Sequence, residues 1–463
     1  MIVTVILGIV GLGVMVFVHE AGHFVAAKIN GIGVEVFSLG WGPRLAGFVR
    51  GGTTYQISWF PIGGYCKLKG ELVPGIAGGG AEGAKQAEKA APPADSFLAA
   101  RPWRRIVLSA FGPLFNLAFA AIIFTIIWWV GFNTYSSDNR VILATDYTLD
   151  SFPQTPPATS AGLKTGDRIT AIDGAAVRSF QDILEAVSVA PGKQLVLAIQ
   201  RDTGSGAQTL MLRMTPQLDK DSGAGRIGIY AWVDPVVASV AQGSASAIAG
   251  LRKGDRIVAV DGRSVGNTID LSQALAGKPA KVSMSYERAG APETATLVFV
   301  YDGKGNANLG LGFASLVYRS PRMGLGGAVG KSVAETWSTL ALTVKGIGLL
   351  FQGINLRNAV AGPLRITYYI GTAAASGFQM GIGAGVVSFF RFLGFLSVVL
   401  FLMNLLPIPA MDGGQIILFI VEIARGKPVR SRLIWRLQII GFSILILLSL
   451  FVTFSDVLFF MGR

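Results

Sequence analysis

Long uncharged stretches separate the membrane-facing parts of this chain of 463 residues from its water-facing parts. An apolar helix needs about 20 residues to cross a hydrocarbon core of about 30 Å, because each residue adds about 1.5 Å. Stretches of that length, nearly free of charged residues, occur at 2–27, 106–132, 384–406 and 434–455. The pattern therefore predicts an α-helical polytopic membrane protein with four transmembrane helices.

Composition and charge support this prediction and indicate an orientation. Hydrophobic residues make up 51% of the chain and charged residues 14%, and the net charge is +13. The basic residues do not form one nucleic-acid-binding face, because ten of them lie within 28–105 and five within 425–436. Basic clusters beside spans mark the cytoplasmic side. We therefore expect both clusters inside, residues 133–328 outside, and a lipid bilayer but no nucleic acid as partner.

The segment that precedes the third span has a helical rather than a spanning pattern. Residues 328–351 carry three charges, and their apolar side chains recur at helical spacing: Trp337, Leu340, Val344, Ile347 and Phe351. This periodicity predicts an amphipathic helix on the outer membrane surface. Residues 317–383 are accordingly expected to form a surface helix and a loop, which separate the first membrane half, 1–132, from the second, 384–463.

The segment between the first two spans has the alternation of a strand. Apolar and polar residues alternate from Thr54 to Phe60, with glycine-rich turns on both sides. This predicts a membrane-associated β-hairpin within residues 42–70, near the inner face. Residues 74–95 are rich in glycine, alanine, proline and lysine, and are expected to be a flexible insertion.

A repeat dominates the outer region. Residues 161–174 and 249–262 are identical at ten of fourteen positions, and each copy contains a turn, an alternating strand and an Asp-Gly turn. Two β-rich domains, 133–222 and 223–316, are expected, and they resemble PDZ domains of the bacterial protease type. Such domains capture peptide termini at a sheet edge. We assign Ile227, Gly228 and Ile229 to the peptide-binding loop of the second copy; a purely steric role for both copies remains open.

The two histidines of the chain lie in one pentapeptide at the end of the first apolar stretch. His19 and His23 are four residues apart, so on a helix they share one face and can reach one metal ion, with Glu20 placed as a general base. Ionisable residues at membrane depth are costly and are usually functional. The alternatives are a cleaved signal peptide, which would lack a basic start and would discard both histidines, and a structural histidine pair.

A catalytic zinc site usually has three protein ligands, so a third must come from elsewhere. With no further histidine, the candidates are a carboxylate or Cys66. Asp412 follows the third span after two helix-breaking prolines, on the predicted inner side where the histidines lie. An Asp-Gly turn, or an N-cap for a helix over 415–423, is the alternative role.

The combination of His-Glu-Ala-Gly-His in the first span with N-x-x-P-x-x-x-x-D-G after a later one resembles the site-2 protease family of intramembrane zinc metalloproteases. With its tandem outer repeat, the chain is similar to the bacterial branch of that family. The resemblance implies one Zn²⁺ per chain, bound by His19, His23 and Asp412, and a water molecule activated by Glu20.

The resemblance also implies residues that support the substrate or the transition state. The motif Gly112-Pro-Leu-Phe-Asn116 matches the family's G-P-x-x-N element, and a hairpin of the family dips toward the active site, where its edge would pair with an unwound substrate. The implied residues are Asn116, Asn404, Gly63, Gly64 and Ile57. Two positions depart from the usual pattern: Met411 replaces a leucine and Gln415 a histidine.

The expected function is therefore cleavage of a transmembrane segment in the bacterial inner membrane. The active site would face the cytoplasm and the PDZ-like domains the outside. The resemblance implies single-span substrates, such as anti-sigma factors already trimmed outside or remnant signal peptides. The alternatives are a membrane-anchored metalloprotease for soluble proteins, a non-catalytic PDZ scaffold and a metal transporter.

Overall fold

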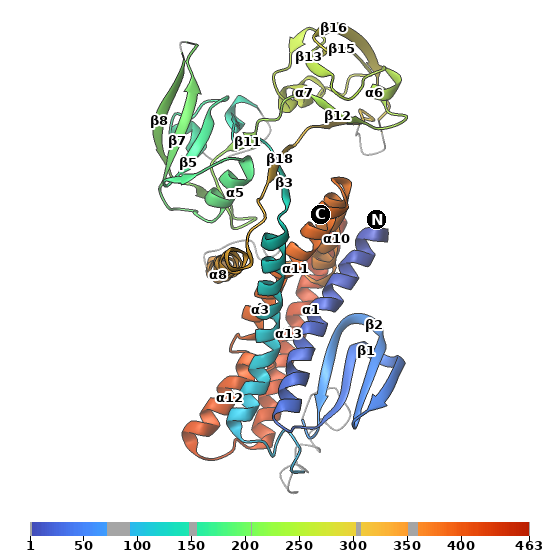
Figure 1. Cartoon of the computed structure of the whole chain (residues 1–463), viewed down its shortest axis with the longest axis vertical. Helices are drawn as coiled ribbons and strands as arrows, with labels where there is room; N and C mark the ends of the chain where they lie inside the picture. The colour runs from blue at the N-terminus through green and yellow to red at the C-terminus, as the bar shows by residue number, and fades with distance from the viewer. Residues whose placement is uncertain are drawn as a thin grey trace. The chain divides into compact units, whose positions relative to one another are not determined.

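The computed structural model describes residues 2–71, 93–147, 155–204, 206–301, 307–350 and 360–462. These residues form two compact units (Figure 1). The membrane unit comprises Met1–Phe132 and Arg319–Arg463, and the β unit comprises Asn133–Tyr318. Most of the predicted flexible insertion, 74–95, lies outside the described residues.

Four helices of the membrane unit are long and apolar enough to span a bilayer, which confirms the predicted number of spans. A shorter helix, α12, precedes the last of them. Local sequence sets several helix ends: α3 has a proline in its first turn and ends at Gly131, and α12 ends at a left-handed Gly426. The bounds are α1 Ile2–Ile29, α3 Pro102–Val130, α11 Ile382–Asn404, α12 Asp412–Arg425 and α13 Ser431–Phe460.

Glycines let α1 approach its neighbours closely. A Cβ at Gly22 would lie 2.3 Å from the carbonyl oxygen of Phe111 on α3. At the other end of α1, a Cβ at Gly8 would lie 2.1 Å from the carbonyl oxygen of Thr367. Small residues at helix interfaces allow such backbone contact between membrane helices, where dispersion replaces the hydrophobic effect as the driving force. The position of α1 is thus fixed at both ends.

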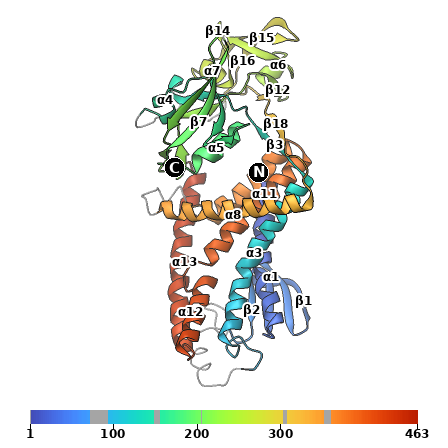
Figure 2. The same cartoon turned by 60° about the vertical axis from the view of Figure 1, so that its left-hand side comes forward.

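Helix α8 (Leu325–Leu350) runs across the other helices rather than along them (Figure 2). It contacts α3 through buried Ala328 and Ser332, and the Ser332 hydroxyl donates to the Ala121 carbonyl oxygen at 2.6 Å. Trp337 is 70% exposed, and Leu340 packs against the α3 core. Of the apolar residues predicted to share one helix face, Leu340 therefore faces the protein and Trp337 is exposed.

The loop expected after α8 contains a helix instead. Helix α10 (Pro363–Gln379) packs against α1 and α11, with Ile370 and Ala374 fully buried. The sequence prediction was wrong here because α10 is too short and too polar to resemble a span. Its helical state depends on burial of its glycine- and alanine-rich face, which sequence alone does not reveal.

The inner hairpin is a folded-over sheet of two long strands, β1 (Val34–Arg50) and β2 (Thr53–Leu68). The first part of β1 pairs with both ends of β2: Leu39 lies opposite Ile57 and also opposite Gly64. Ile57 also pairs with Ala46, so it lies inside the sheet. The prediction of Ile57 at a free edge is therefore wrong; the edges are formed by 44–50 and 64–68.

The β unit contains two bodies with the same sheet order. The first sheet has the order β6-β5-β7-β8 and the second β14-β13-β15-β16, as the sequence repeat requires. Each body also contains two short α-helices. The first body comprises β3 Asn133–Ser136, β4 Val141–Leu143, η1 Ala144–Asp146, α4 Pro157–Ser160, β5 Arg168–Ile172, β6 Ala175–Ala176, α5 Phe180–Ser188, β7 Leu195–Asp202, β8 Ala207–Met214, β9 Gln217–Leu218, β10 Gly225–Arg226 and β11 Ile229–Ala231. The second comprises β12 Val237–Val240, α6 Ala245–Ile248, β13 Arg256–Val260, β14 Arg263–Ser264, α7 Thr268–Ala274, β15 Lys281–Arg288, β16 Ala291–Val298 and β17 Leu311–Phe313. The strand that follows, β18 Leu316–Arg319, pairs with β3.

The expected peptide loop belongs to the first body rather than to the second. Ile227 is 2% exposed in the first core, and Ile229 in β11 pairs with Leu143 in β4. In the second body, β17 pairs with β12 in the same way, so Gly310 takes the place that Gly228 has in the first. The assignment of Ile227, Gly228 and Ile229 to the second copy is therefore corrected, because the segment that closes each body follows its sheet in sequence.

Two glycines of α1 provide a matched test of helix packing. Gly8→Ala places a methyl group against the Thr367 backbone, whereas a Cβ at Gly13 meets nothing within 4 Å. Overpacking of this kind costs about 1–3 kcal/mol, so Gly8→Ala should lower the melting temperature of the purified protein in detergent. Gly13→Ala should leave the melting temperature unchanged or raise it, since alanine favours helix. Equal melting temperatures for the two variants would contradict the packing described.

Candidate metal centre and active site

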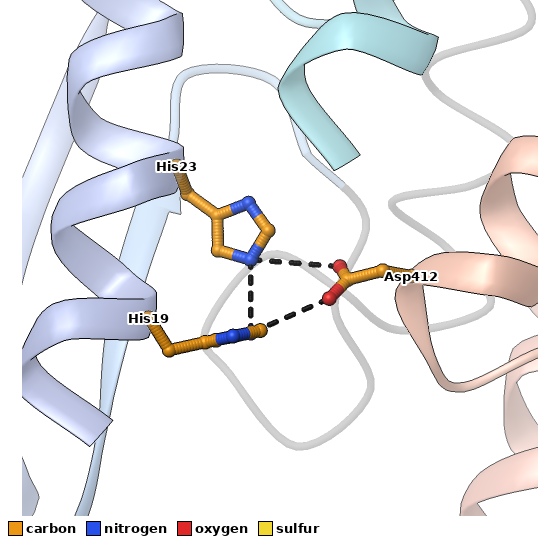
Figure 3. A group of neighbouring side chains, drawn as sticks. All are labelled: His19, His23 and Asp412. Atoms are coloured by element: carbon orange, nitrogen blue, oxygen red, sulfur yellow. Dashed lines mark hydrogen bonds and ion pairs between the residues drawn. The ribbon is translucent and has the colours of Figure 1, made fainter. Parts of the chain in front are cut away.

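Two helices bring together the three predicted ligands (Figure 3). His19 and His23 lie one turn apart on α1, and their Nε2 atoms are 3.2 Å apart. Asp412, the first residue of α12, places one carboxylate oxygen 3.3 Å from His19 Nε2 and the other 3.5 Å from His23 Nε2. The three side chains converge on one point from parts of the chain that are almost 400 residues apart in sequence.

These separations fit a tetrahedral zinc ion. Zinc bonds of about 2.0–2.1 Å to nitrogen and oxygen place adjacent tetrahedral ligands about 3.3–3.4 Å apart. The three distances between ligand atoms, 3.2, 3.3 and 3.5 Å, lie around that value. The donor set of two imidazoles and one carboxylate is also one that catalytic zinc sites use. The residues present therefore fit the metal that the sequence predicted.

Helix α3 contacts both imidazoles. His23 Nδ1 lies 3.0 Å from the Leu108 carbonyl oxygen, and the Asn116 side-chain amide lies 3.3 Å from His19 Nδ1. Gly112 lies between these two residues, where a Cβ would come within 2.3 Å of His23 Nε2. Any larger residue at position 112 would displace the rings.

The turn after α11 places Asp412. Helix α11 ends at Asn404, and α12 begins at Asp412 with Met411 as its N-cap and no side-chain capping bond. The carboxylate is therefore directed toward the imidazoles and does not cap the helix. Gly413 and Gly414 pack against the preceding turn, where Cβ atoms would lie 2.2 Å from Leu405 O and 2.1 Å from Ile408 O. The Gly-Gly pair permits the tight turn that directs Asp412 to the histidines.

A cavity of about 220 Å³ adjoins the three ligands. Glu20 and Asn404 line it, as do Ser109 and Gln415. Gly64 borders the Glu20 side chain, since a Cβ there would lie 3.6 Å from Glu20 Cγ. Its full lining is His19, Glu20, His23, Trp41, Tyr65, Cys66, Lys67, Leu68, Glu71, Leu108, Ser109, Asn404, Ala410, Met411, Asp412 and Gln415. Four consecutive residues of the edge 64–68 thus face the same cavity as the general-base candidate.

Two further ionisable groups of the cavity lie outside the spanning helices. Burial raises the pKa of the Glu71 carboxyl to about 7, partly opposed by a hydrogen bond from the Leu68 N–H. Burial also raises the pKa of the Cys66 thiol, and nearby Glu20 acts in the same direction. A metal ligand must be a thiolate. Geometry decides between the two candidates: among the described residues, Asp412 is the one whose ligand atom lies within 4.8 Å of those of both histidines, and Cys66 does not belong to that group.

A buried ion pair that the sequence did not reveal fixes α12 against α3. Arg105 Nη2 lies 2.5 Å from Glu422 Oε2, and both side chains are at least 94% buried. The second oxygen of Glu422 accepts the Val429 N–H at 2.8 Å. Because Asp412 begins α12 and Asn116 lies on α3, this pair aligns the two helices that surround the histidines. No spacing signal connects residues 105 and 422 in the sequence.

The residues predicted to support the substrate do not all lie near the cavity. Asn404 lines the cavity, Gly64 lies beside the Glu20 side chain, and Gly63 adopts a positive φ of 92° beside Trp41. Asn116 is fully buried behind His19. Ile57 lies within the sheet, and the segment 227–229 belongs to the β unit.

The fold and the site define a class: a membrane-embedded metalloprotease. A model of peptidase family M50 matches residues 7–448. The chain therefore belongs to peptidase family M50, the site-2 protease family, which confirms the resemblance found in the sequence.

Relatives match along nearly the whole chain. The chain is 35% identical over 460 residues to the "Putative zinc metalloprotease" of Treponema pallidum (strain Nichols), with 99% of each chain covered. It is 30% identical over 469 residues to the regulator of sigma-E protease RseP of Salmonella typhimurium (strain 14028s / SGSC 2262), with 97% of each chain covered. It is 29% identical over 470 residues to RseP of Escherichia coli (strain K12), again with 97% of each chain covered.

Glu71 should make the stability of the metal-free protein depend on pH. Its carboxyl ionises near 4.5 when unfolded and near 7 when folded, so the folded state retains a proton that the unfolded state has lost. Stability contributed by this group therefore falls as pH rises from about 4.5 to about 7. Glu71→Gln should flatten the fall in melting temperature over that window in the presence of a chelator. An unchanged pH profile would show that Glu71 titrates normally.

Proposed function

We propose that this metalloprotease is a zinc-dependent intramembrane endopeptidase that cleaves transmembrane segments of single-span proteins. The observation that supports this most directly is the convergence of His19, His23 and Asp412 beside Glu20 in a cavity among apolar helices. One zinc ion per chain, bound by those three residues, would supply Lewis-acid activation of the scissile carbonyl and of the attacking water.

The chain's own residues then have distinct tasks. Glu20 lines the cavity next to the first ligand, where it would take a proton from the water and pass it to the leaving amine. Asn404 lines the same cavity at the end of α11 and would donate to the substrate backbone or to the transition state. Gly63 and Gly64 would leave room for an extended substrate beside Glu20.

The sheet edge 64–68 is the part of the chain best placed to hold such a substrate. A transmembrane helix has its peptide bonds shielded by hydrogen bonds, so it must be extended before hydrolysis. Tyr65, Cys66 and Lys67 lie in an edge segment paired on one side only, to 36–38, and they line the cavity. Strand addition at this edge would fix the register of the cleaved segment.

Orientation and partners follow from charge and from the relatives. The basic clusters within 28–105 and 425–436 favour a cytoplasmic position for the metal-site end of the helices in the bacterial inner membrane. Helix α8, with exposed Trp337, would lie on the outer membrane surface. Two of the relatives described above carry the name "Regulator of sigma-E protease RseP". An anti-sigma-factor-like protein trimmed on its outer side, or a remnant signal peptide, is therefore the proposed substrate.

The two bodies of the β unit would act on the outer side of the membrane. We assign them a PDZ-like role, either binding peptide termini or excluding substrates with folded ectodomains. Their repeated sheets support the assignment, and so does the loop that precedes each closing strand, at Gly228 in the first body and Gly310 in the second.

Glu20→Gln tests the proposed chemistry. Cleavage of a single-span reporter with a short ectodomain, by purified protein in detergent, should fall by at least about 10²-fold because the general base is lost. Bound zinc should remain at one per chain. Glu185→Gln, an exposed change on α5, should cleave like wild type. Undiminished cleavage by Glu20→Gln, or cleavage outside the reporter's span, would contradict the proposal.

Proline substitutions at the two edges of the sheet test substrate pairing. Tyr65→Pro removes a backbone N–H from the edge segment that lines the cavity, and Phe48→Pro removes one from the opposite edge. Each variant also loses one aromatic contact, Tyr65 with Trp41 and Phe48 with Tyr55. Cleavage should fall markedly in Tyr65→Pro and little in Phe48→Pro, with zinc content unchanged in both. Equal losses of cleavage in the two variants would show that cleavage depends on the integrity of the whole sheet and not on substrate pairing at the edge 64–68.

A further inference from the structure

We propose that Asn116 is a positioning residue whose side-chain oxygen accepts the Nδ1–H of His19 and so keeps His19 Nε2 directed at the metal site. The inference rests on the proposed function. It also changes the role expected for Asn116, which the family resemblance had placed against the substrate.

The location of Asn116 separates it from the substrate. Its side chain is fully buried on α3, and among the described residues that line the cavity Asn404 is present and Asn116 is not. A group that does not reach the cavity has no direct contact with a peptide bound there. Asn116 therefore acts through a neighbour, and the neighbour at its amide is His19.

The proton on His19 determines which atom of the amide must face it. His19 Nε2 lies 3.2 Å from His23 Nε2 and 3.3 Å from Asp412, so it is the ligand atom and carries no hydrogen. The neutral ring then has its proton on Nδ1 and is a donor there. The Asn116 amide lies 3.3 Å from that atom, and only its oxygen can accept.

An unsatisfied atom supports this orientation. With the amide nitrogen facing His19, two donors oppose each other, and the buried Asn116 oxygen has no hydrogen-bond partner among the described residues. Buried amide oxygens are rarely unpaired. Rotating the amide by a half-turn exchanges two atoms of nearly equal size and places the oxygen on the Nδ1–H.

The other metal-site histidine is held in the same way. His23 Nδ1 lies 3.0 Å from the Leu108 carbonyl oxygen. Leu108 and Asn116 are eight residues apart on α3, about two turns, so their acceptors lie on one face of that helix. Each imidazole would thus have one nitrogen for the metal and one bonded to α3. Such partners fix ring orientation, and their loss typically weakens metal binding by about 10–100-fold.

The test compares zinc affinity in two asparagine variants of the full-length protein in detergent. Asn116→Leu removes the acceptor at similar volume, and Asn404→Leu makes the same change at the cavity. Competition with a chelating dye should show Zn²⁺ binding about 10–100-fold weaker in Asn116→Leu and unchanged in Asn404→Leu. Asn116→Asp, which retains an acceptor, should restore affinity. With Co²⁺ in place of Zn²⁺, the visible absorption bands should change in Asn116→Leu alone.

Each other outcome is decisive. Unchanged Zn²⁺ affinity in Asn116→Leu would overturn the inference, because the His19 ring would then keep its direction without the Asn116 acceptor. Equal weakening in Asn116→Leu and Asn116→Asp, with a lowered melting temperature of the metal-free protein, would indicate a packing role and overturn it too. Failure of the wild type to bind Zn²⁺ would instead contradict the proposed function.

Discussion

The site depends on how closely α1 approaches α3. Gly22 of α1 faces the Phe111 carbonyl at a distance that no side chain would permit, and Gly112 of α3 lies against both imidazoles. This contact places the His19 and His23 rings between the two helices, with one nitrogen of each toward α3. Two glycines thereby fix the position and orientation of both histidines. In a membrane helix pair, where apolar surface alone gives little driving force for association, such close contact is also what holds the helices together.

Asp412, the proposed third ligand, is held by a separate set of contacts. The Gly413-Gly414 turn directs Asp412, and the Arg105–Glu422 pair holds the helix that Asp412 begins against α3. A buried pair of this kind is costly to desolvate, so it adds little net stability, but breaking it would leave one charge buried alone. The pair therefore contributes mainly by holding α12 in a fixed position against α3. Helix α3 contacts both histidines and also α12, so it sets the position of all three proposed ligands relative to one another.

A hydrolytic site at membrane depth must admit water and an extended peptide without exposing unpaired backbone to lipid. Irregular backbone is tolerated at that depth only where it lines a cavity or is buried in protein. The turn from Asn404 to Asp412 satisfies this condition, since several of its residues line the cavity beside Glu20. The sheet of β1 and β2 could pair with the backbone of an extended peptide. It packs against α1, and its edge 64–68 lies at the same cavity.

The sequence by itself determined the features that are local or periodic. Length and apolarity predicted the four spans, the i, i+4 spacing predicted that His19 and His23 share a face, and the repeat predicted two similar sheets. Tertiary structure decided what depends on contacts between distant segments. The burial of α10, the pairing of Ile57 on both sides and the inclusion of Ile227 in the first core all arise from partners far along the chain. The place of Asn116 behind His19 was hidden for the same reason: a motif gives the residue, but only the packing of α3 on α1 shows which atom it faces.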